Sequence, residues 1–402
     1  MAKAMMVSGN GMDVKKKRPF HKAACLLRID RLPDIHHKRN VSATASSKIF
    51  DDRMSDVAMA KATLPIPSFF ESQAIDALWR VPYQQRASEA ADWAHRHRIP
   101  SAANDAFQTA LLLIDVQNTF CMPDFELFVG GRSGTAAVDD NRRLCRFIYR
   151  NLHRLTEICP TMDTHQIYQI FHNMFLVDRE GRHPAPYTTI STGDLEKGVW
   201  RFNAALSPRL KLSADEGQRY LQHYARELER RGKYALTIWP YHAMLGGLGH
   251  ALVPAVEEAV FFHGISRLSP PDFHIKGHNP LTENYSVLRP EITTDAAGHP
   301  IDDKNRALID KLLNFDAVVI AGQAKSHCVA WTIEDLLTEI QARDPSLARK
   351  IYLLEDCTSP VVIPGVIDYT TPADRAFQKF ADAGMHRVNT TIPLSEWPGF
   401  GQ

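Results

Sequence analysis

The sequence lacks a strong excess of charge, a long apolar run and a paired-cysteine motif, and each absence excludes a class of function. Its 47 Lys and Arg nearly balance its 46 Asp and Glu, which leaves a formal net charge of +1. Binding to nucleic acid through the phosphates needs a basic field that this balance does not supply. No apolar segment approaches the length of a membrane span or of a signal-peptide core. We therefore expect neither nucleic acid nor a membrane as a partner.

Cysteine is scarce and scattered. The six cysteines stand at positions 25, 121, 145, 159, 328 and 357, without CxxC or zinc-finger spacing. Isolated cysteines of this kind are typical of reduced thiols in a reducing compartment. We therefore expect a cytoplasmic protein.

The chain does have enough apolar residues, 44% of 402, for one large domain with additions. Its first fifty residues differ, because they carry eleven Lys or Arg against three Asp and show little apolar periodicity. We expect residues 1–65 to be a basic, disordered extension and residues 66–107 to be a lead-in. The domain itself should occupy residues 108–402, with an insertion at 176–233.

Expected strands and helices alternate along this domain. We expect strands at residues 110–116, 158–162, 234–239, 259–265, 315–320 and 350–354. We expect helices at residues 139–157, 214–231, 329–343 and 372–384. Such alternation indicates an α/β fold, a mostly parallel sheet with helices on both faces.

Cys328 falls where the strand at 315–320 gives way to the helix at 329–343. The unpaired N–H groups and the dipole at a helix start favour an anion, so we expect this thiol to ionise more easily than a free cysteine. A thiolate there would be well placed to attack a carbonyl. The alternative interpretation is a small buried hydrophobic residue, which most free cysteines are.

Four polar clusters lie at or just beyond expected strands. They are Asp115-Val116-Gln117-Asn118, Asp163-Thr164-His165 with His172, Trp239-Pro240-Tyr241-His242, and Lys276-Gly277. An aspartate after a strand is most often a cap or turn residue. Chance pairs of histidines are also common in a chain that has eighteen. Asp-x-His with a further histidine nevertheless offers the carboxylate and imidazole groups that a divalent transition metal binds.

Taken together, these clusters resemble the motifs of the isochorismatase-like cysteine hydrolase superfamily, and are most similar to its nicotinamidase branch. The matching segments are Asp115 to Cys121, Asp163 to His165 with His172, Trp239 to His242, Lys276-Gly277 with Tyr285-Ser286, and Gly322 to Val329. The resemblance runs from residue 108 to residue 392 and is interrupted by the insertion. It implies the isochorismatase-like hydrolase fold.

The resemblance implies a catalytic triad. Cys328 would be the nucleophile, Asp115 the general base and proton shuttle, and Lys276 the cation that orders the site. A cis peptide bond between Gln323 and Ala324 is also implied. The backbone N–H groups of Ala324 and Cys328 would then form the oxyanion hole.

A metal site and a substrate pocket are implied as well. The positions that match the metal ligands of nicotinamidases are Asp163, His165, His172 and His242. In that family the metal positions the pyridine nitrogen of the substrate, and this ligand set favours Zn, Fe or Mn. The positions expected to bind substrate are Phe120, Trp239, Gln323 and Tyr285.

The chain departs from the family pattern in several places. Thr164 stands where nicotinamidases usually have an aromatic residue that stacks on the pyridine ring, and Gln323 replaces an aliphatic residue. The insertion 176–233 enters between His172 and His242, so we expect it to cover the pocket. The aromatic residues that it offers for stacking are Tyr187, Trp200 and Phe202. The alternative is that the insertion makes a surface or oligomer contact.

The position of the catalytic lysine has an alternative too. Phe262-His263-Gly264 also aligns with the family's lysine motif and would put a histidine there. We prefer Lys276, because Tyr285-Ser286 follows it at the expected offset.

The leading hypothesis is therefore a cysteine amidohydrolase that acts on nicotinamide or a related carboxamide through a thioester, as a homo-oligomer. An alternative is a family hydrolase of another amide or of a ureido substrate. A non-catalytic metal-binding protein is the alternative from a different functional class.

Overall fold

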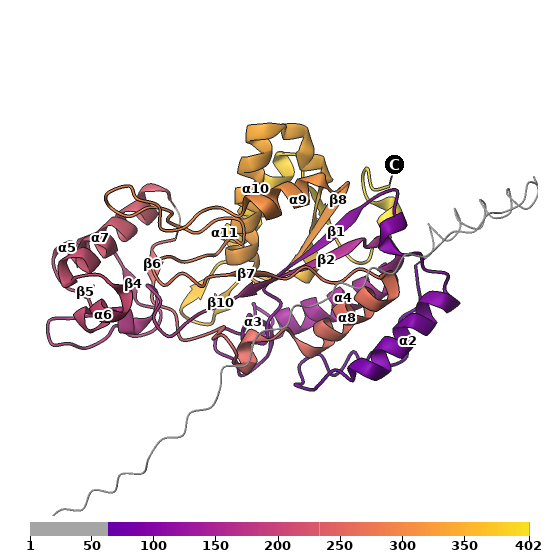
Figure 1. Cartoon of the computed structure of the whole chain (residues 1–402), viewed down its shortest axis with the longest axis horizontal. Coiled ribbons are helices and arrows are strands. Elements are labelled where there is room, and N and C mark those ends of the chain that lie inside the picture. The colour runs from indigo at the N-terminus through magenta and orange to yellow at the C-terminus, as the bar shows by residue number, and fades with distance from the viewer. Residues whose placement is uncertain (1–62, 233, 402) are drawn as a thin grey trace, which may run out of the picture. The chain divides into compact units, whose positions relative to one another are not determined.

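A six-stranded parallel sheet lies at the centre of the computed structural model, which describes residues 63–232 and 234–401 (Figure 1). The strands are β1 (Thr109–Ile114), β2 (Glu157–Asp163), β7 (His274–Lys276), β8 (Ala317–Gly322), β9 (Ile351–Leu354) and β12 (His386–Val388). Their order across the sheet is β12, β9, β8, β1, β2, β7, and each neighbouring pair is parallel. The inner strands β1 and β8 are buried throughout, as expected for apolar runs covered on both faces.

Helices cover both faces of this sheet (Figure 1). On one face lie α2 (Tyr83–Arg96), α4 (Ala136–Arg150) and α8 (Pro254–Arg267). On the other lie α9 (Arg306–Asn314), α10 (Ala330–Arg343) and α11 (Thr370–Asp382). Strand β1 joins the two cores, because Leu111 and Leu113 pack on the first face while Leu112 and Ile114 pack on the second. The predicted α/β fold is confirmed.

The insertion at 176–233 has an apolar core of its own. Its elements are β3 (Leu176–Val177), β4 (Thr189–Ile190), α5 (Thr192–Glu196), β5 (Arg201–Phe202), α6 (Ser207–Leu210) and α7 (Ala214–Arg230). Helix α7 confirms the predicted helix, and it begins at a capping box formed by Ser213 and Glu216. One face of α7, with Tyr220, Leu221 and Tyr224, packs against Phe202 and its neighbours.

Two expected strands of the central sheet were wrong. Residues 259–265 lie inside α8, which packs against both α2 and α4. A buried helix reads as a continuous apolar run, which periodicity cannot distinguish from a buried strand. Residues 234–239 contribute only β6 (Leu236–Thr237), which pairs with β4 outside the sheet.

Other boundaries also differ from expectation. Helix α4 ends at Arg150 rather than at residue 157, because β2 already begins at Glu157. Strands β7 and β12 were not predicted, since each has only three residues. The remaining short elements are α3 (Asn118–Cys121), β10 (Val362–Ile363) and β11 (Ile367–Asp368).

Residues 1–62 of the expected extension lie outside the described residues. The lead-in consists of α2 and irregular segments, with Trp79 and Trp93 packed against the core of the first sheet face. Within the part of the chain that the structure describes, no helix is both long and apolar enough to cross a membrane. The five cysteines of this part are all free and buried.

Candidate active site

Four parallel strands bring the predicted polar residues to one edge of the sheet. Asp115 follows β1, Asp163 ends β2 and Lys276 ends β7. Cys328 follows β8, in a π-helical turn (Lys325–Val329) that leads directly into α10. Because the carboxyl ends of parallel strands meet at one edge, residues far apart in the chain come together there.

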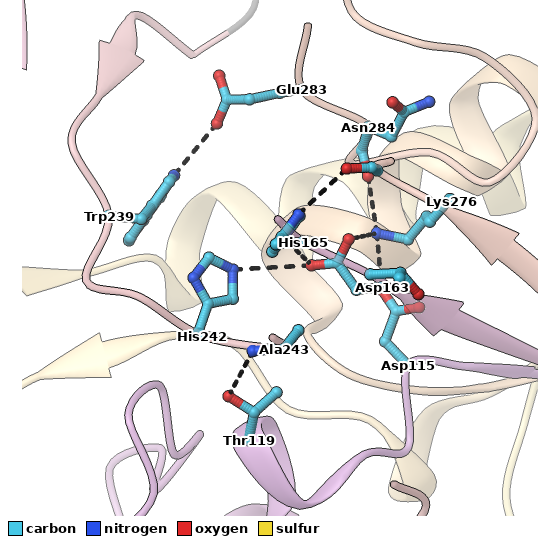
Figure 2. A network of polar contacts seen from close by, with 12 residues as sticks. Asp115, Thr119, Asp163, His165, Trp239, His242, Ala243, Lys276, Glu283 and Asn284 are labelled. Atoms are coloured by element: carbon cyan, nitrogen blue, oxygen red, sulfur yellow. Dashed lines mark hydrogen bonds and ion pairs between the residues drawn. The ribbon is translucent and has the colours of Figure 1, made fainter. Parts of the chain in front are cut away.

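The ammonium of Lys276 contacts the other three residues of this group, and Figure 2 shows it beside Asp115, Asp163 and Asn284. Its Nζ lies 3.0 Å from Asp115 Oδ2, 3.0 Å from Asp163 Oδ1 and 3.6 Å from Cys328 Sγ. It also donates a hydrogen bond of 2.7 Å to the backbone carbonyl of Asn284. All of these side chains except that of Asn284 are buried. The structure thus brings together the three residues predicted as a triad.

Thr161 fixes the carboxylate of Asp115. The Thr161 hydroxyl donates to Asp115 Oδ1 at 2.5 Å and accepts the backbone N–H of Asp115 at 3.0 Å. Asp115 itself has a positive φ of 47°, which turns its side chain out of the strand direction. The remaining oxygen is therefore directed to Lys276.

The electrostatics of Cys328 differ from the sequence prediction. Burial raises the pKa of the Cys328 thiol well above its ordinary value, although the Lys276 ammonium acts in the opposite direction. The expectation of an easily ionised thiol is therefore wrong for the resting site. The physical reason is that Cys328 is only 8% exposed and that the nearby carboxylates of Asp115 and Asp163 oppose a further negative charge.

The acid–base partners of this thiol are also shifted. Burial raises the pKa of Asp115, against the effect of Lys276. Burial alone would lower the pKa of Lys276, but Asp115 and Asp163 outweigh it and raise that pKa well above its ordinary value. The lysine is therefore held as a cation, while Asp115 is a carboxylate that readily takes up a proton.

The loop before Cys328 leaves β8 under tight steric constraint. A Cβ atom at Gly322, whose φ is 117°, would lie 2.0 Å from the carbonyl oxygen of Ile114 on the neighbouring strand. Only glycine fits this approach. The Gln323–Ala324 peptide bond is cis, as the family resemblance implied.

Gln323 does not line the cavity, contrary to prediction. Its side-chain amide donates to Asp140 Oδ2 at 2.9 Å and its carbonyl oxygen accepts the backbone N–H of Ser359 at 3.3 Å. The side chain is completely buried between these partners. Gln323 thus holds the loop in place from behind, because a buried amide must pair its polar atoms locally.

Three of the four predicted metal ligands form a compact group. Ligand atoms of Asp163, His165 and His242 all lie within 4.8 Å of one another. His165 Nε2 lies 2.8 Å, and His242 Nε2 3.7 Å, from Asp163 Oδ2. His172 lies outside this group, with its ring centroid 6.1 Å from that of His165.

The three histidines all direct Nδ1 at a backbone carbonyl oxygen. Each is within hydrogen-bonding distance of a backbone carbonyl through Nδ1: His165 with Gly277 at 3.3 Å, His242 with Pro240 at 2.8 Å, and His172 with Ile167 at 3.2 Å. This arrangement leaves Nε2 as the available ligand atom. His172 Nε2 is buried and has no hydrogen-bond partner among the described residues. A carboxylate and neutral imidazoles fit a divalent transition metal.

Burial keeps the imidazoles of His172 and His242 neutral. It lowers the pKa of His172 to about 3 and also lowers that of His242. Neutral imidazole is the form that binds metal. Gly277 adds a close approach, because a Cβ atom there would lie 2.9 Å from both Asp163 and His165.

In a second group of possible metal ligands, a lysine already neutralises the carboxylate. Cys159, Asp272 and His274 also lie within 4.8 Å of one another. However, Lys311 Nζ lies 2.6 Å from Asp272 and 2.5 Å from Glu157, so an ammonium already supplies the positive charge that this cluster needs. This group therefore carries no metal assignment.

A cavity of about 240 Å³ lies in front of Cys328. The lining residues are Phe120, Phe125, Glu126, Leu127, Phe128, Val129, Asp163, His165, Phe171, Tyr187, Trp239, His242, Glu283, Asn284, Tyr285, Ala324, His327, Cys328, Val361, Val362 and Ile363. The predicted positions Phe120, Trp239 and Tyr285 are among them. The thiol of Cys328, the three candidate metal ligands and several aromatic side chains thus line one cavity.

The insertion contributes to this cavity through Tyr187. Trp200 and Phe202, the other two candidates for stacking, belong instead to the core of the insertion. Phe202 is 5% exposed and lies edge-on to Phe175, with ring centroids 5.4 Å apart. Phe202 lies on the two-residue strand β5, and so short a strand needs side chains packed against a helix to be stable.

Sequence reasoning missed several residues of the site. Thr161 lies two positions before Asp163 on β2 and therefore on the same face, so strand alternation offered a signal for it. Glu283, Asn284 and His327 lacked such a signal, because loop geometry places the first two and the nucleophile turn places the third.

His263, the alternative match for the predicted catalytic lysine, lies away from the cavity. His263 lies on α8, where its Nε2 is 2.9 Å from the carbonyl oxygen of Leu155. It is buried in the core and does not line the cavity. Lys276 is the residue beside Cys328.

Comparisons with solved structures find enzymes of one kind at low identity. A nicotinamidase/pyrazinamidase of Acinetobacter baumanii is 18% identical, with 72% of this chain and 99% of that chain covered and a TM-score of 0.41. The yeast nicotinamidase is 17% identical, with 70% and 100% covered and a TM-score of 0.42. The pyrazinamidase of Pyrococcus horikoshii, in complex with zinc, is 17% identical, with 70% and 99% covered and a TM-score of 0.38.

No protein-family model and no curated protein matches the chain. In the order of its motifs, the chain resembles the nicotinamidase branch of the isochorismatase-like cysteine hydrolases.

Proposed function

We propose that this protein is a cysteine amidohydrolase, which hydrolyses nicotinamide or a related heteroaromatic carboxamide to an acid and ammonia. The observation that carries the proposal is the position of Cys328. Its sulfur lies 3.6 Å from Lys276 Nζ and lines the same cavity as Asp163, His165 and His242. A nucleophile, a cation and a metal-binding group within one aromatic cavity suit attack on an aromatic amide.

The residues that would hold a divalent metal are Asp163, His165 and His242, with His172 beside them. When bound, such a metal would supply an electrophilic anchor for a ring nitrogen of the substrate. Phe120 and Trp239 would contact the ring that is held in this way. Zn, Fe and Mn all suit these ligands.

The first chemical step uses Asp115 as base. Its carboxylate is a hydrogen-bond partner of the Cys328 thiol and takes that proton as the sulfur attacks the amide carbon. The C–S bond forms while the carbonyl π bond becomes an oxyanion. The backbone N–H groups of Ala324 and Cys328 would donate to this oxygen.

The second step releases ammonia. Asp115 gives the proton to the amide nitrogen, the C–N bond breaks, and a thioester on Cys328 remains. A water molecule then attacks the thioester, and Asp115 takes one of its protons. The C–S bond breaks, the acid departs and the proton returns to the sulfur. Lys276 stays positively charged throughout and offsets the negative charge on the thiolate.

Release of ammonia from a panel of aromatic carboxamides tests this proposal. We expect turnover of at least one ring carboxamide, and a mass increase of an acyl group on the peptide that contains Cys328. Cys357→Ala serves as a matched control, because that cysteine is buried and does not line the cavity. Release of ammonia by Cys328→Ala at the wild-type rate would refute the proposal.

The alternative of another amide or a ureido substrate has one observation in its favour. Thr164 has no aromatic ring, and its hydroxyl donates to the carbonyl of Met162 at 3.0 Å and lies 2.8 Å from His250 Nε2. That position therefore adds no stacking surface to the cavity. Ureido compounds belong in the same panel, where they would also release ammonia.

A further inference from the structure

One buried carboxyl group of the cavity takes no part in the steps above. Glu283 lines the cavity and is 3% exposed. Its Oε1 accepts the indole N–H of Trp239 at 3.2 Å, and its Oε2 accepts the hydroxyl of Tyr224 at 3.3 Å. Figure 2 shows Glu283 and Trp239 together, apart from Asp115 and Lys276. Glu283 thus faces the part of a substrate that does not react.

The whole cavity has an acidic and aromatic lining. Its carboxyl groups belong to Asp163, Glu126 and Glu283, and no lysine or arginine is among the described residues that line it. Its aromatic residues are Phe120, Phe125, Phe128, Phe171, Tyr187, Trp239 and Tyr285. Aromatic faces and carboxylates attract cations and N–H donors. An anionic group beside Glu283 would find no cationic side chain among the described lining residues.

Glu283 is poised between its two charge states. Burial raises its pKa to about 8, with a further contribution from the carboxylate of Glu291. Hydrogen bonds from Tyr285, Trp239 and Tyr224 act in the opposite direction. A cationic group placed beside Glu283 would favour the carboxylate, whereas an anionic group would favour the neutral acid.

We propose that Glu283 is a specificity residue, which selects aromatic carboxamides that carry a cationic or N–H-donating substituent. This inference rests on the proposed function for the site but adds the class of substrate. Trp239 has a supporting part, because its indole N–H donates to Glu283 and the chain segment that follows it leads to His242. Glu126 is exposed and screened by water, so it contributes less to selection.

The test compares three ring carboxamides that differ only in one substituent: aminomethyl, methyl or carboxylate. We expect the wild-type protein to prefer the aminomethyl amide over the methyl amide by about tenfold in kcat/KM, equivalent to about 1.4 kcal/mol. The carboxylate amide should be the poorest of the three. The preference for the aminomethyl amide should increase from about pH 6 to about pH 8.5, as Glu283 loses its proton.

Glu283→Gln keeps the size of the side chain and removes its titration. In this variant we expect the preference to fall to about twofold or less and to become independent of pH. Glu196→Gln, which changes an exposed glutamate outside the cavity that pairs with Arg226, should retain the wild-type preference. Trp239→Phe removes one donor to Glu283, so the increase in preference should move to higher pH.

A binding measurement separates the inference from the proposed function. The Cys328→Ala variant should bind the three amides in the same order of affinity by calorimetry, whether or not the wild type releases ammonia. If Cys328→Ala binds the three amides in the expected order but the wild type releases ammonia from none of them, the amidase proposal is refuted and the role of Glu283 is supported. Equal binding of all three amides, or an unchanged preference in Glu283→Gln, would overturn the role of Glu283. The wild-type pH profile decides the matter if Glu283→Gln does not fold.

Discussion

The ammonium of Lys276 lies 3.6 Å from the sulfur of Cys328, although 52 residues separate them in the chain. The same ammonium also lies 3.0 Å from Asp115 and 3.0 Å from Asp163. One buried cation thus lies between two buried carboxylates, and it is also close enough to stabilise a negative charge on the sulfur. In the proposed mechanism, Lys276 therefore has both a structural role and a chemical role.

We predict that Lys276→Met abolishes turnover and lowers the free energy of unfolding by about 3–5 kcal/mol, because two carboxylates stay buried without their cation. Urea denaturation measures the loss. Lys379→Met is the matched control, since Lys379 is exposed and pairs with Glu334 at the surface. That change should have little effect on stability. Equal stability of both variants would contradict the role of Lys276.

We predict that Cys328→Ala abolishes turnover while the protein stays folded, because its sulfur forms the covalent intermediate. Alanine substitutions of the cysteines outside the cavity should leave the chemistry intact: Cys121, Cys145, Cys159 and Cys357. Rates of ammonia release and circular dichroism check these outcomes. Loss of activity on alkylation of another cysteine, with Cys328 unmodified, would contradict the assignment.

The raised pKa of Cys328 gives a prediction about its reactivity. A thiol with a raised pKa is protonated at neutral pH, so its alkylation rate should increase steadily above pH 7, without a plateau near neutrality. Iodoacetamide labelling of Cys328 across pH, followed by peptide mass spectrometry, measures this. A labelling rate that is already maximal near pH 7 would show that Lys276 overcomes burial.

The sequence predicted the site well where strand ends determine it. The apolar runs of β1, β2 and β8 were visible, and parallel strands necessarily bring their carboxyl ends together. The sequence therefore predicts Asp115, Asp163 and Cys328 at or just beyond strand ends, and the parallel order of the strands brings them to one edge. Lys276 needed the family resemblance, because β7 is too short to produce a pattern.

Features that depend on burial in three dimensions could not be predicted. The thiol of Cys328 follows the prediction in position but not in pKa, because desolvation by distant segments outweighs the helix start. Helix α8 resembled a strand, since it is buried between two other helices. Glu283 lies on a loop that reaches the cavity, and the path of a loop cannot be predicted from the periodicity of apolar residues.

We predict that the purified protein holds about one transition metal per chain, because three ligand atoms already converge. His165→Ala should lose this metal and raise KM strongly, while the alkylation of Cys328 changes little. His299→Ala is the control, since that histidine is exposed and pairs only with Asp295 in the described structure. Elemental analysis that finds no metal in protein never exposed to chelator would contradict this prediction.

Glu283 predicts how stability changes with pH. Its pKa is raised from 4.5 to about 8 in the folded protein, so between these values the folded state holds a proton that the unfolded state has lost. Stability from this group is complete below about pH 4.5 and is lost as pH rises toward 8. Glu283→Gln should therefore gain stability relative to the wild type over this interval. Free energies of unfolding from urea denaturation that change with pH in the same way for the wild type and Glu283→Gln would contradict the raised pKa of Glu283.

The last prediction distinguishes two aromatic residues of the insertion, one that lines the cavity and one that belongs to the core of the insertion. Tyr187 lines the cavity, so Tyr187→Ala should raise KM by about tenfold, or about 1.4 kcal/mol, with little loss of stability. Phe202 belongs to the core of the insertion, and a Cβ atom at Gly217 would lie 2.3 Å from its ring. Phe202→Ala should therefore cost about 3–5 kcal/mol of stability.

Steady-state kinetics and urea denaturation of both variants distinguish these roles. A change in oligomer size with unchanged kinetics for Tyr187→Ala would favour the view that the insertion is a contact between subunits. A raised KM for Tyr187→Ala alone is expected if the insertion closes the cavity through that one side chain. In that case Phe202 acts only indirectly, by filling the core that holds the segment of Tyr187 in place. This segment places the ring of Tyr187 beside that of Trp239, with ring centroids 6.1 Å apart.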